Sequence, residues 1–496
     1  MQDESVAEGG MILVIDAGTT SNRAMVFAPD GKVHALAQRP LTQHYPQPGR
    51  VEHDADEIWQ GVLACARQAV AQAGGVDRIA AIGIANQRET VVAWDKASGA
   101  PLSRAIVWQD RRTAAACAAL RAAEREADVQ AATGLILDPY FSATKMAWLL
   151  DHVPEVKAAA GAGRLALGTV ESWLLYKLTG GAHLSDASNA ARTSLMPLAG
   201  ADWDAGLCDL FGVPRSALPE IGDCADEIGM ALPEWLGAPV PVTGMAGDQQ
   251  AATIGQACLT EGETKATYGT GAFVLANRGR HVPSSRHRLL ATVLWQLGGE
   301  RVYALEGSVF VAGSLVQWLR DSLGLIDAAA ETEALARSVS DSGGVVIVPA
   351  LSGLGAPHWR ADARASITGL TFASTRAHLA RAALEAMAMQ TRDLAEAFAA
   401  DGAQWTTLRI DGGMSANDWM AQDLADILAL PVERPAFVET TALGAGMLAG
   451  LGAGLFGSLE EASRAMGGAR HTFAPAMAET VRDARIGDWK RALETV

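Results

Sequence analysis

A strand–turn–strand pattern occurs twice in this sequence, about half a chain apart, and it constrains the fold more than any other feature. In residues 11–38, three apolar segments are separated by short turns at 18–21 (Gly-Thr-Thr-Ser) and 29–31 (Pro-Asp-Gly). Turns this short join antiparallel strands. Residues 264–279 repeat the pattern, with a Gly-Thr-Gly turn between two strand-like segments. The repeat predicts two structurally similar lobes.

Segments with helical and strand periodicity alternate in both halves of the chain. Residues 57–74 have the 3.6-residue apolar spacing of a helix, and 78–84 form a short apolar run typical of a buried strand. In the second half we expect strands at 343–350 and 407–413 and a long helix from His378 to about Ala400. This alternation predicts α/β sheets with helices on both faces.

The boundary between the lobes is predicted near residue 255, after the segment PVTGMAGDQQAATIG. The N-terminal lobe then spans residues 11–255 and the C-terminal lobe residues 256–496. Each part is long enough to bury a core of its own.

Composition and charge exclude several classes of protein. Of the residues, 49% are hydrophobic and 19% are charged, which is typical of an ordinary globular protein. The net charge of −16 argues against a nucleic-acid partner, because nucleic-acid binding needs a basic surface. The five cysteines form no CxxC pair, which indicates reduced thiols in a cytoplasmic protein rather than a disulfide frame or a zinc site.

Two further segments bear on export and membranes. The first ten residues, MQDESVAEGG, are too acidic and polar for a secretory signal, and we expect a frayed leader there. Residues 441–459 are uncharged and place Gly446, Gly450 and Gly454 at GxxxG spacing. Because this segment is diluted by glycine and flanked by glutamates, we predict a close-packed buried helix ending in a glycine loop, and no integral membrane segment.

A polar pentad, Asn86-Gln87-Arg88-Glu89-Thr90, lies between the apolar run at 78–84 and a second apolar run. Read alone, it is a solvated turn. Alternatively, it is a cluster of hydrogen-bonding groups at the C-terminal edge of a sheet, where α/β proteins bind ligands. The pentad by itself leaves both interpretations open.

Three turns that contain glycine are candidates for binding a nucleotide. In the first turn, 18–21, backbone N–H groups and hydroxyls can approach an anion. Asp16 precedes this turn, and its carboxylate can hold a divalent cation through water. The turn at 268–271 matches it in the second lobe, and two opposed turns of this kind suit a polyphosphate. The third, 411–417, leads from a strand into a helix that Ser415 is expected to cap. Each of them, taken alone, is also an ordinary tight turn.

The segment Gly247-Asp248-Gln249-Gln250 places an acid beside two amides at the crossover between the lobes. A carboxylate in this position can accept a proton from a hydroxyl group and orient that group. The alternative is that Asp248 is a helix N-cap.

Taken together, these segments resemble the FGGY carbohydrate kinases of the actin–hexokinase–chaperone ATPase superfamily, from about residue 11 to about residue 455. The pentad and the aromatic-rich block at 138–152 are the most specific, and they are similar to the glycerol-phosphorylating members. The matching segments are 16–23, 86–90, 105–113, 138–152, 247–252, 268–271, 304–321, 353–359 and 411–417. The resemblance implies two actin-like or ribonuclease-H-like lobes, with mixed sheets flanked by helices and an active site in the interlobe cleft.

The activity implied by the resemblance is transfer of the γ-phosphoryl group of ATP to a terminal hydroxyl of glycerol, with Mg²⁺ as cofactor and Asp248 as catalytic base. The implied substrate-binding residues are Arg88, Glu89, Trp108, Tyr140, Asp248, Gln249 and Phe273. These residue types suit a triol, since its hydroxyls need bidentate and charged partners and its hydrocarbon edge needs an aromatic wall.

The resemblance also implies positions for the nucleotide and the metal ion. Asp16 and Asp248 would hold Mg²⁺ against the phosphates. The implied ATP-binding residues are Thr19, Thr20, Ser21, Arg23, Thr270, Gly313, Gln317, Gly413 and Asn417. A cytoplasmic homo-oligomer, dimer or tetramer, is the expectation from how often enzymes of this kind assemble.

The sequence departs from the family pattern at several positions. Ala17 stands where these kinases commonly carry Gln, and Arg360 and Ser366 replace an acid and a glycine. Residues 230–240 lack the loop with which many bacterial members bind fructose 1,6-bisphosphate, so we do not expect feedback by that sugar. Two alternatives stay open: a kinase of another polyol or sugar, such as erythritol or a ketopentose, and an actin- or chaperone-like ATPase, which would not need the Arg88-Glu89 pair.

Overall fold

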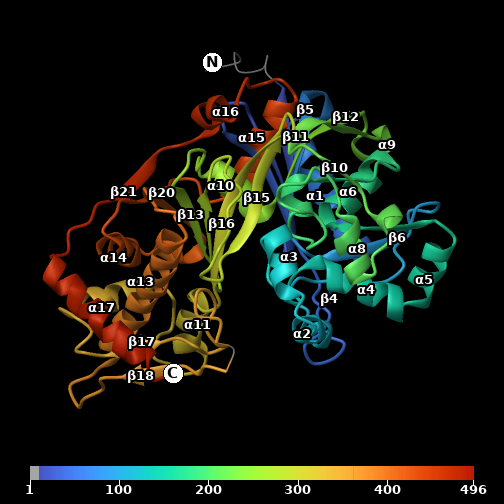
Figure 1. The fold of residues 1–496 in the computed structure, drawn as a ribbon. Helices are drawn as coiled ribbons and strands as arrows, with labels where there is room; N and C mark the ends of the chain where they lie inside the picture. Colours follow the sequence, from blue (N-terminus) through green and yellow to red (C-terminus); the bar gives the residue numbers. More distant parts are fainter. Residues whose placement is uncertain (1–9, 361) are drawn as a thin grey trace, which may run out of the picture.

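The computed structural model describes residues 10–360 and 362–496, so all but the last residue of the expected leader lies outside the described residues. Two lobes lie side by side, and each is built on a mixed sheet with helices packed against it (Figure 1). The predicted α/β fold class is confirmed.

The N-terminal lobe contains a six-stranded sheet in the order β11-β12-β5-β1-β2-β3. The strands β1, β2 and β3 are consecutive and antiparallel, as their tight turns require, and β5 and β12 add parallel strands beyond β1. Strand β1 is buried along its whole length, which explains its unbroken apolar sequence. The strands are β1 Met11–Ala17, β2 Ser21–Phe27, β3 Val33–Pro40, β5 Ile79–Asn86, β11 Ala225–Ala231 and β12 Val240–Gly247.

The C-terminal lobe contains a seven-stranded sheet in the order β15-β16-β14-β13-β19-β20-β21. Here β13, β14 and β16 are antiparallel neighbours, and β19 and β20 add parallel strands beyond β13. The order β16-β14-β13-β19-β20 therefore corresponds to β3-β2-β1-β5-β12, and the predicted repeat is confirmed. The strands are β13 Glu263–Tyr268, β14 Ala272–Asn277, β15 Leu290–Leu297, β16 Glu300–Val309, β19 Thr407–Asp411, β20 Val432–Pro435 and β21 Arg470–Phe473.

Smaller sheets extend both lobes. A four-stranded sheet, β4-β7-β6-β8, lies beside the six-stranded sheet and was not expected. The strand predicted at 343–350 is wrong in extent, because only Val346–Val348 (β17) is extended, and it pairs with Ser366–Thr368 (β18) outside the main sheet. The remaining strands are β4 Glu52–His53, β6 Val91–Asp95, β7 Ala105–Ile106, β8 Leu165–Thr169, β9 Leu184–Asp186 and β10 Glu220–Gly222.

The two helices singled out in the sequence are present as α1, Ala55–Gln72, and α13, Arg376–Ala400. In the N-terminal lobe the other helices are α2 Ala114–Ala122, α3 Glu126–Thr133, α4 Ser142–His152, α5 Pro154–Gly161, α6 Val170–Thr179, α7 Ala187–Ala190, α8 Ala205–Phe211, α9 Pro233–Leu236 and α10 Asp248–Gly255. The C-terminal half adds α11 Gly313–Asp321, α12 Glu331–Arg337, α14 Asp418–Leu428, α15 Thr440–Gly452, α16 Leu459–Met466 and α17 Glu479–Leu493.

Helices α10 and α15 pack against each other where the lobes meet. Helix α15 comes from the C-terminal half of the chain but lies on β1, β5 and β12 of the N-terminal sheet. A Cβ on Gly444 would lie 1.8 Å from the carbonyl oxygen of Ala251, so the two helices approach this closely only because glycine stands there. The segment 441–459 therefore contributes the predicted buried helix, α15. Among helices of the described residues, none has both the length and the apolarity to cross a bilayer.

Candidate active site

The polar pentad joins two different sheets and is buried. β5 ends at Asn86 in the six-stranded sheet, and β6 begins at Val91 in the four-stranded sheet. All five residues from Asn86 to Thr90 are at most 3% exposed, so the interpretation of the pentad as a solvated turn is wrong. Glu89 has φ +60°, and the amide of Thr90 donates to the carbonyl of Arg88 at 2.8 Å. The chain therefore forms a γ-turn centred on Glu89, a strained conformation of the kind that occurs at functional sites.

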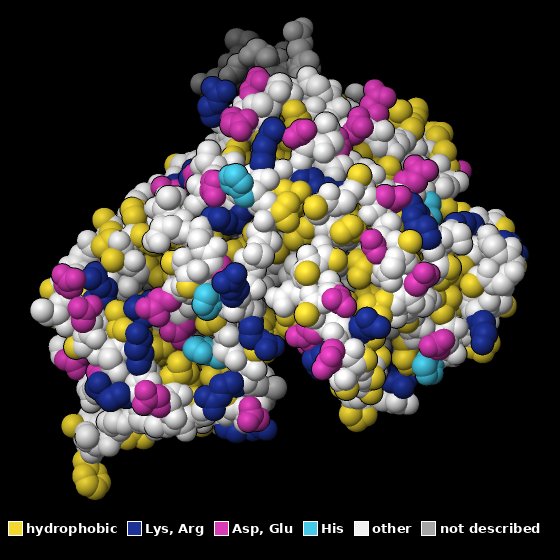
Figure 2. All heavy atoms as spheres, in the orientation of Figure 1, with side chains coloured by type: hydrophobic (Ala, Val, Ile, Leu, Met, Phe, Trp, Pro, Cys, Tyr) yellow, Lys and Arg dark blue, Asp and Glu magenta, His cyan; other side chains and the backbone are white. Residues whose placement is uncertain are grey.

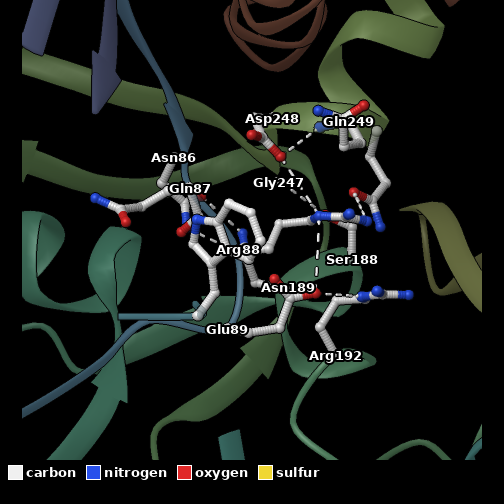
Figure 3. A network of polar contacts seen from close by, with 12 residues as sticks. Asn86, Gln87, Arg88, Glu89, Ser188, Asn189, Arg192, Gly247, Asp248 and Gln249 are labelled. Carbon is white, nitrogen blue, oxygen red and sulfur yellow. Dashed lines mark hydrogen bonds and ion pairs between the residues drawn. The ribbon is translucent and has the colours of Figure 1, made fainter. Parts of the chain in front are cut away.

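Arg88 lies at the centre of a network of polar contacts (Figure 3). Its Nη1 donates to Glu306 Oε2 at 2.6 Å, and its Nη2 donates to the Tyr140 hydroxyl at 3.3 Å. Its Nε lies 3.4 Å from Asp248 Oδ1. Arg88 thus connects the pentad with the segment before α4, with α10 and with β16 of the C-terminal lobe.

Two charged residues that sequence reasoning missed complete this network. Glu306 and Arg192 are both 0% exposed. Arg192 donates to Glu89 Oε1 at 2.6 Å and to Glu306 Oε1 at 3.0 Å. Burial alone would raise the pKa of Glu306, but Arg192 and Arg88 hold it at about 2. An acid inside the apolar run 302–309 was the available signal, since a buried charge requires a partner.

Asp248 is the first residue of α10 and follows directly after β12 (Figure 3). Gly247 occupies the cap position, so the interpretation of Asp248 as an N-cap is wrong. The Asp248 carboxylate accepts a hydrogen bond from the Gln249 amide at 2.7 Å and is partly exposed. Burial raises the pKa of Asp248, and Arg88 opposes this rise. The amide of Gly247 donates to Ser188 Oγ at 3.0 Å, which fixes the start of the helix.

Three aromatic rings border the network. Trp108 meets Tyr140 edge to face, with ring centroids 5.6 Å apart, and meets Phe273 with centroids 6.4 Å apart. All three residues are partly exposed, and Phe273 belongs to β14 of the C-terminal lobe. The indole Nε1 of Trp108 donates to Thr19 Oγ1 at 2.9 Å. The aromatic wall therefore adjoins the glycine turn between β1 and β2.

The residues of the first glycine turn, between β1 and β2, differ in their exposure to solvent. Thr20 is exposed, whereas Ser21 is buried and its hydroxyl accepts a hydrogen bond from Gln38 Nε2 at 2.9 Å. Arg23, on β2, forms an ion pair with Glu439 ahead of α15. The turn is thus tied both to its own sheet and to the segment that leads into α15.

The second glycine turn, between β13 and β14, exposes Gly269 and Thr270. The amide of Ala312 donates to the Thr270 carbonyl at 2.9 Å. Helix α11 begins at Gly313, where a Cβ would lie 2.5 Å from the Gly269 carbonyl oxygen. Glycine is therefore required for α11 to reach the turn, and Gln317 follows as an exposed residue of the same helix.

The third glycine turn, 411–417, corrects one prediction. Ser415 does not cap the following helix; its hydroxyl donates to a backbone carbonyl within a short 3₁₀ turn. Asn417 is the cap of α14, and its side chain accepts a hydrogen bond from a backbone N–H of that helix at 2.9 Å. Gly413 is exposed, and a Cβ there would meet no atom within 4 Å, so open space lies beside it.

Gln249 is held by a buried lysine that sequence reasoning also missed. Lys265 Nζ donates to Gln249 Oε1 at 2.5 Å and to Thr267 Oγ1 at 2.8 Å. Lys265 lies on β13 of the C-terminal lobe, so this contact, like that of Glu306, joins the lobes. A lysine in the middle of the predicted strand that leads into the second glycine turn was the signal in the sequence.

Asp16 and Asp248 fit a magnesium ion that is shared with phosphate groups. Burial raises the pKa of Asp16 to about 7 against the effect of Arg23, and the charges of Asp248 and Glu439 add to the rise. A cation would relieve this excess of negative charge. In residues 10–360 and 362–496, no group of three or more His, Cys, Asp or Glu is arranged to hold a metal ion. Magnesium commonly uses one or two carboxylates and completes its shell with water and substrate phosphates, so two carboxylates suffice.

The predicted site residues therefore come from both lobes, and the molecular surface is hollowed between the lobes (Figure 2). Direct contacts connect most of the predicted substrate-binding set, with Gln249 joined to it beside Asp248. Thr19 adjoins this set, whereas Gln317, Gly413 and Asn417 lie on the C-terminal lobe, on and beside α11 and α14.

Comparison with known proteins gives the same architecture. Models of the N-terminal and C-terminal domains of the FGGY family of carbohydrate kinases match residues 11–255 and 264–453. A glycerol kinase of Rhodospirillum centenum is 55% identical over 491 residues, which is 98% of each chain. The crystal structure of Plasmodium falciparum glycerol kinase with ADP has a TM-score of 0.93 at 36% identity, and xylulose kinase from Rhodospirillum rubrum has 0.87 at 27%. Both alignments cover 98% of each chain.

The fold and the site define a two-lobed kinase of small hydroxylated molecules. The chain belongs to the FGGY family of carbohydrate kinases. Membership excludes the alternative of an actin- or chaperone-like ATPase.

Proposed function

We propose that this protein transfers the γ-phosphoryl group of ATP to a terminal hydroxyl group of glycerol. The observation that carries the proposal is the convergence of Arg88, Glu89, Tyr140 and Asp248 on one polar network bordered by aromatic rings. Relatives named glycerol kinase, 55% and 54% identical over 98% of the chain, support glycerol as the substrate. The related kinase solved with ADP supports an adenine nucleotide as the donor.

The proposed polyol pocket pairs each hydroxyl group with a polar side chain. Arg88, Glu89, Tyr140 and Gln249 supply donors and acceptors, and Trp108 and Phe273 lie along the carbon chain. A pocket whose polar groups are all paired by a triol discriminates against an analogue that lacks one hydroxyl, because a buried polar group is then left unpaired.

Asp248 is the proposed general base. Its carboxylate takes the proton of the attacking hydroxyl as the new oxygen–phosphorus bond forms and the bond from the γ-phosphorus to the bridging oxygen of ADP breaks. Arg88, 3.4 Å away, and the hydrogen bond from Gly247 to Ser188 keep this carboxylate in place. Phosphoryl transfer depends on positioning and on neutralisation of charge, so this set of residues is sufficient in principle.

The nucleotide would lie between the glycine turns of the two lobes. Mg²⁺, held by Asp16 and Asp248, supplies neutralisation of phosphate charge when bound. The residues proposed around the phosphates are Thr19, Thr20, Ser21, Arg23 and Thr270, and those proposed toward the nucleoside are Gly313, Gln317, Gly413 and Asn417.

We divide the chain into lobes at 11–255 and 256–496, and we propose that they close around the substrates to exclude water. Contacts from Phe273 and Glu306 of one lobe to Trp108 and Arg88 of the other support a site that both lobes complete. A cytoplasmic homo-oligomer, dimer or tetramer, is part of the proposal. The five cysteines, all buried free thiols, are consistent with a reducing compartment.

A coupled ADP-release assay tests the proposed reaction. With Mg-ATP, we expect glycerol to support turnover at least about tenfold faster, in kcat/KM, than erythritol or xylulose, because only a triol of this length pairs the pocket without a clash. A reaction without acceptor measures background hydrolysis of ATP. A preference for xylulose or erythritol would instead favour the alternative of another polyol or sugar kinase.

A further inference from the structure

Lys145 is a buried lysine near the site to which the proposed reaction assigns no role. It lies in the first turn of α4 and is 0% exposed. Its Nζ donates to the main-chain carbonyl oxygens of Tyr140 at 2.5 Å, Phe141 at 3.1 Å and Glu89 at 3.4 Å. One ammonium group thus joins the segment before α4 to the pentad, although the two are about fifty residues apart in the chain.

The contact with Glu89 falls on the strained part of the chain. Glu89 has φ +60° at the centre of the γ-turn, a conformation that side-chain-bearing residues rarely adopt and that the surroundings must hold. Its carbonyl oxygen accepts hydrogen bonds from Lys145 Nζ and from Ser142 Oγ, the latter at 3.1 Å. Both donors come from the first turn of α4, so this helix holds the γ-turn in place.

The other contacts of Lys145 fix the second side of the proposed pocket. Tyr140, whose hydroxyl accepts from Arg88, has its main-chain carbonyl bound by the same ammonium group. Burial lowers the pKa of Lys145 to about 7, and the charges of Glu89, Asp110 and Asp138 oppose this fall. A buried amine that donates to the main chain of both segments is placed to set their spacing.

We propose that Lys145 is a positioning residue, which holds the γ-turn at Glu89 and the backbone of Tyr140 in register so that both side chains reach one substrate hydroxyl pair. The inference rests on the proposed function, because it takes Glu89 and Tyr140 as groups that contact the polyol. Lys145 itself touches neither substrate nor phosphate in this role.

The variant Lys145→Met tests the inference, because it removes all the donors at nearly constant volume. We expect the KM for glycerol to rise about tenfold or more while the KM for Mg-ATP changes less than about twofold, since a displacement near 1 Å affects only the polyol side. Ser142→Ala removes the second donor to the Glu89 carbonyl and should raise the KM for glycerol by a smaller factor.

Lys177→Met is the matched control. Lys177 is a partly buried lysine of the same lobe, its Nζ donates to the Gly99 carbonyl at 3.4 Å, and it lies on α6, outside the site. Both KM values of this variant should equal those of the unmodified protein. An unchanged KM for glycerol in folded Lys145→Met, or equal rises in both KM values, overturns the inference. If Lys145→Met does not fold, Ser142→Ala decides, and an unchanged KM for glycerol in that variant overturns it.

Failure of the proposed function gives a different result, because the unmodified protein would then not phosphorylate glycerol. In that case a crystal structure of Lys145→Met decides the inference about the backbone. Loss of the positive φ at Glu89 or a shift of the Tyr140 main chain supports it. A γ-turn and a Tyr140 backbone that superpose on those of the unmodified protein overturn it.

Discussion

The candidate site is organised around a few buried charges whose signs alternate. Arg88 and Arg192 flank Glu306, and Arg192 continues to Glu89. Removing two charges from water is costly unless each finds a partner, so the network stabilises only as a complete set. Asp248 stands at its partly exposed end, 3.4 Å from Arg88, where a carboxylate can meet a substrate hydroxyl.

At this scale the test concerns Asp248. Asp248→Asn should abolish turnover while glycerol affinity stays within roughly tenfold, about 1.4 kcal/mol, because the amide keeps the shape and one acceptor oxygen of the carboxylate but cannot take the proton. Steady-state assays and calorimetric titration with glycerol measure the two quantities. Asp202→Asn, at an exposed ion pair with Arg215, serves as control. A fully active Asp248→Asn protein would remove the assignment of the base.

Among the elements, the pair α10 and α15 places Asp248 relative to both sheets. Helix α10 starts at Asp248, and α15 presses against it and against the strands β1, β5 and β12. The close approach depends on glycines at the contact, since a Cβ on Gly255 would lie 2.0 Å from the carbonyl oxygen of Thr440. Helix α15, whose uncharged sequence resembles a membrane segment, therefore holds α10 and its first residue, Asp248, in position.

Gly444→Ala tests this packing. The added Cβ would lie 1.8 Å from the carbonyl oxygen of Ala251, so the helices must separate, and we expect a loss of about 1–3 kcal/mol in the free energy of unfolding. Calorimetry and urea denaturation measure the change. Gly161→Ala, at the end of α5 with open space around it, should be neutral or stabilise by less than about 1 kcal/mol. Equal stabilities of the two variants would contradict the close-packing argument.

For the whole molecule, the decisive contacts are those that join the lobes. Glu306 and Lys265 of the C-terminal lobe bind Arg88, Arg192 and Gln249 of the N-terminal lobe. The relative placement of the lobes is thus linked to the same charges that shape the proposed pocket. Breaking one of these contacts should affect stability and the geometry of the site together.

The pH dependence of Glu306→Gln tests this link. Arg192 and Arg88 depress the pKa of Glu306 to about 2, below its ordinary value of 4.5, so its stabilisation is present above pH 4.5 and is lost as the pH falls toward 2. At pH 7 the variant should lose roughly 3 kcal/mol of unfolding free energy, measured by calorimetry, and the difference should shrink below pH 4.5.

Glu300→Gln is the matched control on the same strand, because Glu300 pairs with Arg280 where both side chains are exposed. This variant should change stability by less than about 1 kcal/mol at pH 7. A Glu306→Gln protein with the same stability as the unmodified chain at pH 7 would contradict the role of the interlobe network.

Local sequence patterns determined much of the fold. Tight turns predicted the antiparallel strands of both lobes, and helical patterns predicted α1 and α13. The glycine-containing, uncharged segment 441–459 predicted the buried helix α15. The predicted substrate-binding set from Arg88 to Phe273 followed from family resemblance, and the structure brings most of it into contact. These features were predictable because each depends on residues within a few positions of one another, or on motifs read as units.

Only the tertiary structure decided which distant residues complete the site. Arg192 and Lys145 are each unremarkable in sequence, and the acid at Glu306 does not reveal its partners, because the partner of a buried charge lies far along the chain. The cap of α14 shows the same limit: Ser415 and Asn417 both suit a cap, and the 3₁₀ turn at 413–416 selects Asn417. Local rules act within one turn or one period, whereas the cost of burying a charge is met by whatever segment folding brings beside it.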